Sequence, residues 1–222
     1  MTTPTADLWH HYGRTRHATD RAVPDRFSWS WSQDSGPGAA VLGDITGRRV
    51  ADLGAGAARH AAHLAVHHRP AHVVAVDASP AQHAMSSGLY GHLTSRLRLV
   101  HCDVTRHLHA APGIYDVLYS VFGAVDFTEP RELLPAAASA LRPGGRLAFS
   151  TLAHHLGGAP AHPAVQHTEI GARTRTERWP ACAAGCSRNR CGPNSSTRRA
   201  SLGSARRRCP ARPDRAPPTH SW

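Results

Sequence analysis

Short apolar runs alternate with helix-forming stretches through the middle of the chain. After the second run, Ser79 and Pro80 are typical of a helix start, and this helix is expected to extend to about Leu89. Another predicted helix, residues 130–141, is stopped by the sequence R-P-G-G. This alternation predicts an α/β fold, with a doubly wound parallel sheet covered by helices on both faces. The predicted strands are residues 50–53, 72–77, 97–102, 115–120 and 146–151.

The first of these strands runs into a glycine turn. Residues 50–59 read V-A-D-L-G-A-G-A-A-R, and an Ala-rich, helix-forming stretch follows them. Gly54 and Gly56 allow a sharp bend and let a ligand approach the backbone closely. A strand, a glycine turn and a helix N-terminus in this order are typical of a nucleotide site. A tight turn without a ligand is the alternative reading of the same residues.

Asp52 distinguishes two ligand chemistries for this turn. A carboxylate just before the glycines would repel the pyrophosphate of a nicotinamide dinucleotide, whereas it suits the sulfonium and ammonium groups of S-adenosylmethionine. Dinucleotide turns also carry a third glycine where this chain has Ala58 or Arg59. The stretch D-L-G-A-G-A-A-R-H resembles motif I of the class I S-adenosylmethionine-dependent methyltransferases.

Later segments extend this resemblance over about residues 48–152. In order, the chain reads V-V-A-V-D-A-S-P, L-V-H-C-D-V, Y-D-V-L-Y-S-V-F and L-R-P-G-G-R-L-A-F-S-T, which are similar to the successive motifs of that family. The resemblance implies a Rossmann-like methyltransferase core and S-adenosylmethionine as cofactor.

The resemblance also implies roles for individual residues. Asp77 would accept hydrogen bonds from the ribose hydroxyls, Asp103 would contact the adenine amino group, and Asp52 would order the methionine ammonium. For Asp77 and Asp103 the alternative is an acid bonded to backbone at a helix start. Ser120 and Val121 would line the methyl-transfer point. The predicted cofactor-binding residues are Asp52, Gly54, Ala55, Gly56, Asp77, Ala78, Asp103, Val104 and Ser120.

Methyl transfer depends mainly on positioning, because the leaving group is already activated. A general base is required only for a protonated acceptor, and His154, His155 and Tyr12 are the weak candidates for it. His60, His63 and His67 share one helical face, which is expected to be solvated rather than to bind a metal. No metal site is predicted.

Three regions are expected along the chain. Residues 1–46 would form an N-terminal helical or lid segment, in which Trp9, Tyr12 and Trp29 either cover the site or anchor this segment to the core. Residues 47–172 would form the S-adenosylmethionine-binding domain. Residues 173–222 would form an Arg/Pro/Ser-rich, disordered tail.

The tail carries nearly all of the formal charge of +11. Residues 173–222 contain 12 Arg against 2 acids, and Leu202 is their only Leu, Ile, Val, Phe or Met. Such a composition predicts disorder, because little apolar surface can be buried to offset the ordering entropy. Family members need this region for a last helix and two strands beside the fifth strand. That strand is therefore expected to be an open edge, and the chain unstable or weakly active.

We hypothesise that a frameshift near residues 173–178 replaced the family's C-terminal part. Residues 195–203 permit codons that spell L-D-E-A-G-F-T-G when they are read one base earlier, and this string resembles the end of the family's last helix. The basic residues are all Arg, which fits a GC-rich gene and weakens a functional reading of their number. The nucleotide sequence tests this hypothesis.

The cellular compartment and the binding partners are predicted from segments that the sequence lacks. The N-terminus has no apolar segment of a signal peptide, and no apolar run reaches the ~20 residues of a membrane span. A cytoplasmic protein without membrane or specific nucleic-acid partners is predicted, acting on a small-molecule methyl acceptor. The alternatives are a nicotinamide-binding oxidoreductase and a nucleic-acid binder that acts through its basic tail.

Overall fold

The computed structural model describes residues 22–151, 166–171, 181–186 and 196–201. The helices are the 3₁₀ helix η1 (Gly38–Leu42), α2 (Arg59–His67), α3 (Pro80–Tyr90), α4 (Val104–His109), α5 (Ala124–Phe127) and α6 (Pro130–Ala140). The strands are β1 (Arg49–Leu53), β2 (His72–Asp77), β3 (Leu97–His101), β4 (Tyr115–Val121), β5 (Leu141–Thr151), β6 (Gln166–Gly171), β7 (Ala181–Cys186) and β8 (Ser196–Ser201).

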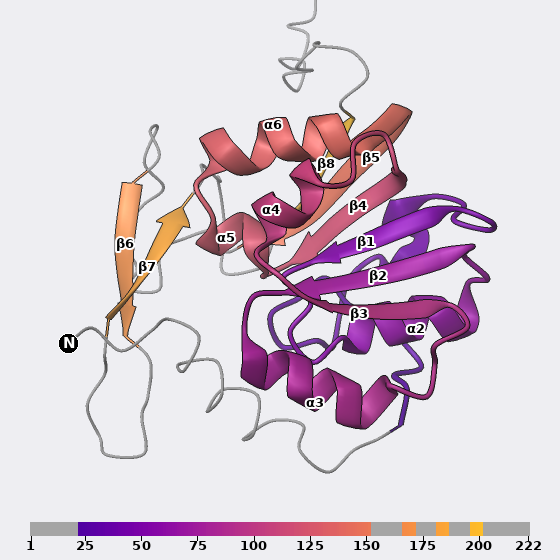
Figure 1. The fold of residues 1–222 in the computed structure, drawn as a ribbon. Coiled ribbons are helices and arrows are strands. Elements are labelled where there is room, and N and C mark those ends of the chain that lie inside the picture. Colours follow the sequence, from indigo (N-terminus) through magenta and orange to yellow (C-terminus); the bar gives the residue numbers. More distant parts are fainter. Residues whose placement is uncertain (1–21, 152–165, 172–180, 187–195, 202–222) are drawn as a thin grey trace, which may run out of the picture.

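The main sheet has the order β3-β2-β1-β4-β5-β8, and β1 to β5 pair in parallel. Figure 1 shows α2 and α3 on one face of this sheet and α4, α5 and α6 on the other. The predicted doubly wound, Rossmann-like parallel sheet is confirmed. Strand order reverses between β1 and β4, and open α/β sheets bind ligands outside the carboxyl ends of the strands at such a point.

Alternating residues of the strands fill two hydrophobic layers. Val50 and Val73 belong to the layer that packs against α2 and α3, whereas Ala51 and Val74 belong to the layer beneath α4 and α6. This alternation arises because successive side chains of a strand point to opposite faces of the sheet. Both faces of the central strands are therefore buried, which explains why these strands read as continuous apolar runs.

The segment before β1 packs into the first of these layers. Trp29 is 1% exposed, and its indole nitrogen donates a hydrogen bond of 2.7 Å to the Gly38 carbonyl oxygen. The short helix η1 ends at Leu42, and Gly43 follows it with a φ of 74°. Of the two roles expected for Trp29, the structure therefore shows the anchor to the core and not the lid. Trp9 and Tyr12 lie outside the described residues.

His63 contradicts the expected solvated histidine face on α2. Its side chain is buried, its Nδ1 lies 2.7 Å from the Pro24 carbonyl oxygen, and its Nε2 lies 3.1 Å from Nε2 of His68. Burial lowers the pKa of His63, so the neutral ring is favoured in the core. Across the ranges that the structure describes, no three His, Cys, Asp or Glu side chains are placed to hold a metal ion.

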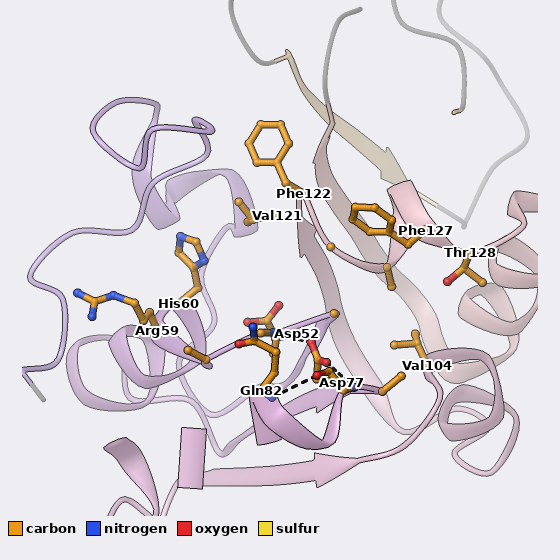
Figure 2. A pocket seen from close by; sticks show the side chains of 18 of the residues that line it. Asp52, Arg59, His60, Asp77, Gln82, Val104, Val121, Phe122, Phe127 and Thr128 are labelled. Carbon is orange, nitrogen blue, oxygen red and sulfur yellow. Dashed lines mark hydrogen bonds between the residues drawn. The ribbon is translucent and has the colours of Figure 1, made fainter. Parts of the chain in front are cut away.

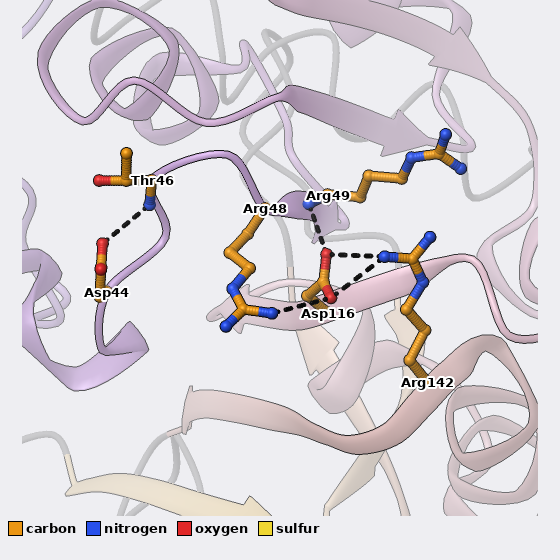
Figure 3. Close-up of polar contacts among 6 residues, drawn as sticks. All are labelled: Asp44, Thr46, Arg48, Arg49, Asp116 and Arg142. Carbon is orange, nitrogen blue, oxygen red and sulfur yellow. Dashed lines mark hydrogen bonds and ion pairs between the residues drawn. The ribbon is translucent and has the colours of Figure 1, made fainter.

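At the amino ends of β1 and β4, Asp116 ties two strands together (Figure 3). Its carboxylate accepts a 2.8 Å hydrogen bond from the Arg49 backbone and contacts the guanidinium groups of Arg142 and Arg48 at 3.4 and 3.5 Å. Burial raises the pKa of Asp116, but these donors outweigh it and hold the pKa below its ordinary value. Asp116 therefore stabilises the amino ends of these strands, whereas Asp52 and Asp77 lie at the carboxyl ends of β1 and β2.

The far edge of the sheet differs from the expectation. β8 pairs antiparallel with β5, from Arg146 opposite Ser201 to Thr151 opposite Ser196, so β5 does not end the sheet. β6 and β7 form a separate antiparallel pair. Ala181–Cys186 and Ser196–Ser201 are therefore strands where composition predicted disorder. Main-chain pairing requires no apolar side chains, so a polar segment can cover an open strand edge.

The fifth strand also begins earlier than predicted. β5 starts at Leu141, directly after α6, and its register against β4 shifts between Tyr115 and Val117. The R-P-G-G sequence occupies this irregularity, with Gly144 at a φ of 77°. None of the helices in the described part of the chain combines the length and the apolar character that crossing a bilayer requires.

Candidate functional site

A cavity of about 320 Å³ lies at the carboxyl ends of the central strands (Figure 2). This volume is in the range of small-molecule sites in proteins. Of the nine residues predicted to bind a cofactor, eight line it: Asp52, Gly54, Ala55, Gly56, Asp77, Ala78, Asp103 and Val104. The strand topology brings these residues together from three separate stretches of sequence.

In the glycine turn after β1, Gly54 has no room for a side chain. Gly54 has a φ of 78°, and a Cβ added to it would overlap the backbone nitrogen of Ala124. A Cβ on Gly123 would lie 2.6 Å from the carbonyl oxygen of Gly54. The backbones that follow β1 and β4 are thus in direct contact, and both line the cavity at this point.

Asp77, at the end of β2, is fixed by backbone amides through both of its oxygens. The Gly56 amide donates to Oδ2 at 2.7 Å, and the Ser79 amide donates to Oδ1 at 2.8 Å. Burial raises the pKa of Asp77, although these two hydrogen bonds oppose the rise. Each oxygen retains lone pairs, so the oriented carboxylate can accept further hydrogen bonds from a ligand.

Asp52 is the most deeply buried acid of the cavity lining. Its side chain is 2% exposed and accepts a 2.9 Å hydrogen bond from the Tyr119 hydroxyl. Burial raises the pKa of Asp52 to about 7, with a contribution from the charge of Asp77, while the hydrogen bond from Tyr119 opposes it. A cation in the cavity would favour the ionised form of this carboxylate.

Asp103 and Ser120 make structural contacts. Asp103 caps α4 by accepting a 2.9 Å hydrogen bond from the Arg106 amide, while also lining the cavity. The Ser120 hydroxyl is fully buried and donates to the Leu53 carbonyl oxygen at 2.8 Å. Ser120 is not part of the lining, whereas Val121, the next residue, is. The base candidates His154, His155 and Tyr12 lie outside the described residues.

Several lining residues were missed by the sequence reasoning. They include Trp31, His60, Gln82, Phe122, Phe127 and Thr128. Burial lowers the pKa of His60 to about 4, so its ring is neutral at physiological pH. Phe122 directly follows β4 and could have been found from its place at a strand end. Nothing in the local pattern around Trp31 indicates that it reaches this cavity.

The lining divides into two sides; in Figure 2, Val121, Phe122 and Phe127 lie across the cavity from Asp52 and Asp77. The carboxylate side consists of the glycine turn with Asp52, Asp77 and Asp103. The aromatic wall consists of Trp31, Val121, Phe122 and Phe127. In the wall, the rings of Trp31 and Phe122 meet edge to face, with centroids 5.2 Å apart and planes at 90°.

Comparison with known proteins agrees with the resemblance that the motifs carry. Residues 50–145 match the family model of the methyltransferase domain. This part of the chain is therefore similar to methyltransferase domains. No curated protein sequence matches the chain.

Solved structures with a similar fold share little sequence with this chain. The complex between the Haloferax volcanii Trm112 methyltransferase activator and a methyltransferase matches with a TM-score of 0.50 and 19% identity, covering 68% of this chain and 62% of that one. Phosphoethanolamine N-methyltransferase 2 of Haemonchus contortus, in complex with S-adenosyl-L-methionine, gives 0.47 and 21%, covering 57% and 28%. A Thiobacillus denitrificans S-adenosylmethionine-dependent methyltransferase with S-adenosyl-L-homocysteine gives 0.47 and 18%, covering 68% and 56%. The chain spans less than two thirds of the length of each of these structures.

Proposed function

We propose that this chain binds S-adenosylmethionine in the cavity and transfers its methyl group to a small-molecule acceptor. The observation that carries the proposal is the pair of carboxylates, the buried Asp52 and the half-buried Asp77, beside a glycine turn in which Gly54 has no room for a side chain. The matched methyltransferase-domain model over residues 50–145 supports the same reading.

The electrostatics of the carboxylate side fit a cationic ligand. Burial raises the pKa of both Asp52 and Asp77, which means that the protein environment disfavours their negative charge. A ligand with positive charge relieves this cost, whereas a pyrophosphate would increase it. S-adenosylmethionine brings a sulfonium and an ammonium, and its ribose brings hydroxyl donors for a carboxylate such as Asp77.

The residues of this chain would bind and orient the reactants. When bound, S-adenosylmethionine supplies a methyl group on an activated sulfur leaving group. Asp77, held by two backbone amides, would fix the ribose; Asp52 would order the methionine ammonium; and Gly54 and Gly56 would let the ligand approach the backbone. The cavity volume of about 320 Å³ is in the range of sites that bind small molecules.

Calorimetric titration of the full chain with S-adenosylmethionine tests this proposal. We expect Asp77→Asn to weaken binding by about 10- to 100-fold, because a hydrogen-bonding carboxylate is worth about 1.5–3 kcal/mol. Asp116→Asn is the matched control. Asp116 is an acid at the amino ends of the strands, away from the cavity, so its substitution should leave the affinity unchanged. Equal affinities of wild type and Asp77→Asn would overturn the assignment of this residue.

The same titration distinguishes the alternatives. NAD should not bind, and duplex DNA should bind only at low salt if the basic tail attracts it, because contacts to phosphates weaken steeply with salt. Tight binding of NAD without binding of S-adenosylmethionine would overturn the proposed function and favour an oxidoreductase.

A further inference from the structure

Phe122 has a backbone conformation that a bulky residue rarely adopts. Its φ is 48°, in the left-handed region, and it is not a glycine. Residues held in such conformations persist only where the surrounding structure imposes them, and they cluster at binding and catalytic sites. This outlier lies in the lining of the cavity, at the end of β4.

The contacts around Phe122 explain what imposes this conformation. Its amide donates a 3.1 Å hydrogen bond to the Ser150 carbonyl oxygen of β5, which continues the sheet by one residue. Immediately afterwards, the backbone of Gly123 and Ala124 must return to pack against Gly54. The chain therefore reverses at Phe122, and a glycine would make this reversal with less strain.

The strained turn directs the Phe122 ring against Trp31. The two rings meet at right angles with centroids 5.2 Å apart, and Trp31 is 37% exposed. Trp29, two residues earlier, is buried in the core and fixes the segment that carries Trp31. Two segments far apart in the sequence thus build one aromatic surface opposite the carboxylates.

We propose that Trp31 and Phe122 hold the methyl acceptor, and that the acceptor is an uncharged molecule with a planar, apolar face. This inference rests on the proposed function, since it assigns the side of the cavity that the methyl donor would leave free. The ionisable residues of the lining, Asp52, Asp77, Asp103, Arg59 and His60, lie outside the aromatic wall. A cationic group would be drawn to Asp52 and Asp77 instead of the wall, and an anionic group to Arg59. A flat apolar face can stack on the exposed indole.

The test uses the full chain saturated with S-adenosylhomocysteine, with the uncharged planar dye N-phenyl-1-naphthylamine as fluorescent probe. We expect saturable binding, and Trp31→Ala and Phe122→Ala should each weaken it at least fivefold while S-adenosylhomocysteine still binds. Leu134→Ala is the matched control, because Leu134 is a large apolar residue on α6 that is 40% exposed and lies outside the lining. Its dye affinity should equal that of the wild type.

A second pair of variants separates a recognition role of Phe122 from a structural one. Phe122→Ala removes the ring and keeps the strain, whereas Phe122→Gly removes both. If the ring serves recognition, both variants lose the dye, and Phe122→Gly melts at least as high as the wild type because the strain is relieved. If the ring mainly supports the fold, Phe122→Gly melts well below the wild type although the strain is gone.

The outcomes keep this inference separate from the proposed function. Failure of S-adenosylhomocysteine to bind would overturn the proposed function itself. If S-adenosylhomocysteine binds, the acceptor assignment is overturned by any of three results: dye binding that occurs in the free chain and is lost on saturation with S-adenosylhomocysteine, unchanged dye affinity in the Trp31 and Phe122 variants, or tighter binding of the cationic probe N,N,N-trimethylanilinium.

Discussion

The carboxylate side and the aromatic wall of the cavity are held in place by different means. On the carboxylate side, backbone amides fix Asp77, and a glycine turn after β1 sets the approach to it. In the aromatic wall, a ring contact between Trp31 and Phe122 and a strained backbone set the geometry. Local backbone geometry sets the first arrangement, whereas the second requires two segments far apart in the sequence to meet. With the proposed function, the first side would hold the methyl donor and the second the acceptor.

The two sides share one backbone contact, so the largest effect is expected where that contact is broken. Gly54→Ala adds a Cβ that overlaps the backbone nitrogen of Ala124, at a φ of 78° that disfavours any side chain. We expect a loss of at least ~3 kcal/mol in the free energy of unfolding, because backbone cannot shift aside as a flexible side chain can. Urea unfolding measures this loss, and titration with S-adenosylhomocysteine should detect no binding.

Gly47→Ala is the control for the backbone conformation alone. Gly47 has a φ of 66°, but an added Cβ would meet nothing within 4 Å. This variant should lose about 1 kcal/mol from its left-handed conformation and still bind S-adenosylhomocysteine. If Gly54→Ala is no less stable than Gly47→Ala, the contact between the two turns is not what holds the cavity together.

The carboxylate side could be predicted from the sequence because local signals define it. A strand, two glycines and an acid at the next strand end are contiguous patterns, and parallel pairing brings strand ends together whatever the loops do. The same logic gave the five central strands. For Asp103 the sequence left two roles open, a contact to the ligand and an acid bonded to backbone at a helix start. In the structure its carboxylate caps α4 and also lines the cavity, so the two roles are compatible.

The aromatic wall and the sheet edge could not be predicted because they depend on long-range contacts. Trp31 and Trp29 stand two residues apart in similar surroundings, yet one lines the cavity and the other is core. His63 is buried by contacts with Pro24 and His68, and the helical spacing of the histidines does not reveal these contacts. β8 pairs through its main chain, so its polar composition gave no sign of it.

The second prediction concerns the pH dependence of S-adenosylmethionine binding. This dependence distinguishes the two sides of the cavity, because the carboxylate side ionises and the aromatic wall does not. With a pKa of about 7, Asp52 is mostly protonated at pH 6 and mostly ionised at pH 7.5 in the free protein. A cationic ligand binds the ionised form better, so affinity should rise by roughly eightfold over this interval. Asp52→Asn cannot ionise and should remove this part of the rise, which calorimetry at several pH values measures.

His60 does not confound this measurement, because its pKa of about 4 keeps the ring neutral throughout the interval. Binding of N-phenyl-1-naphthylamine to the aromatic wall should show no matching pH dependence, since the probe carries no charge there. An affinity for S-adenosylmethionine that is flat between pH 6 and 7.5 in the wild type would show that Asp52 does not sense the charge of the donor.

The smallest effect is expected from Tyr119→Phe, which removes a hydrogen bond to Asp52 and replaces no residue of the cavity lining. The Tyr119 hydroxyl donates to Asp52 at 2.9 Å and opposes the rise of its pKa, so its removal should move the pKa of Asp52 further up from about 7. An upward shift of about one unit follows from the strength of hydrogen bonds to charged groups, and it would weaken S-adenosylmethionine binding at pH 7 by about fivefold. The affinities at pH 8.5 should converge, because Asp52 is then largely ionised in both proteins.

Tyr115→Phe is the matched control on the same strand, since the Tyr115 hydroxyl pairs with His107 at 2.7 Å and Tyr115 is not part of the lining. If Tyr119→Phe weakened binding equally at every pH, the phenol would act by positioning Asp52 rather than by tuning its ionisation. The carboxylate side would then depend on geometry alone, as the aromatic wall does.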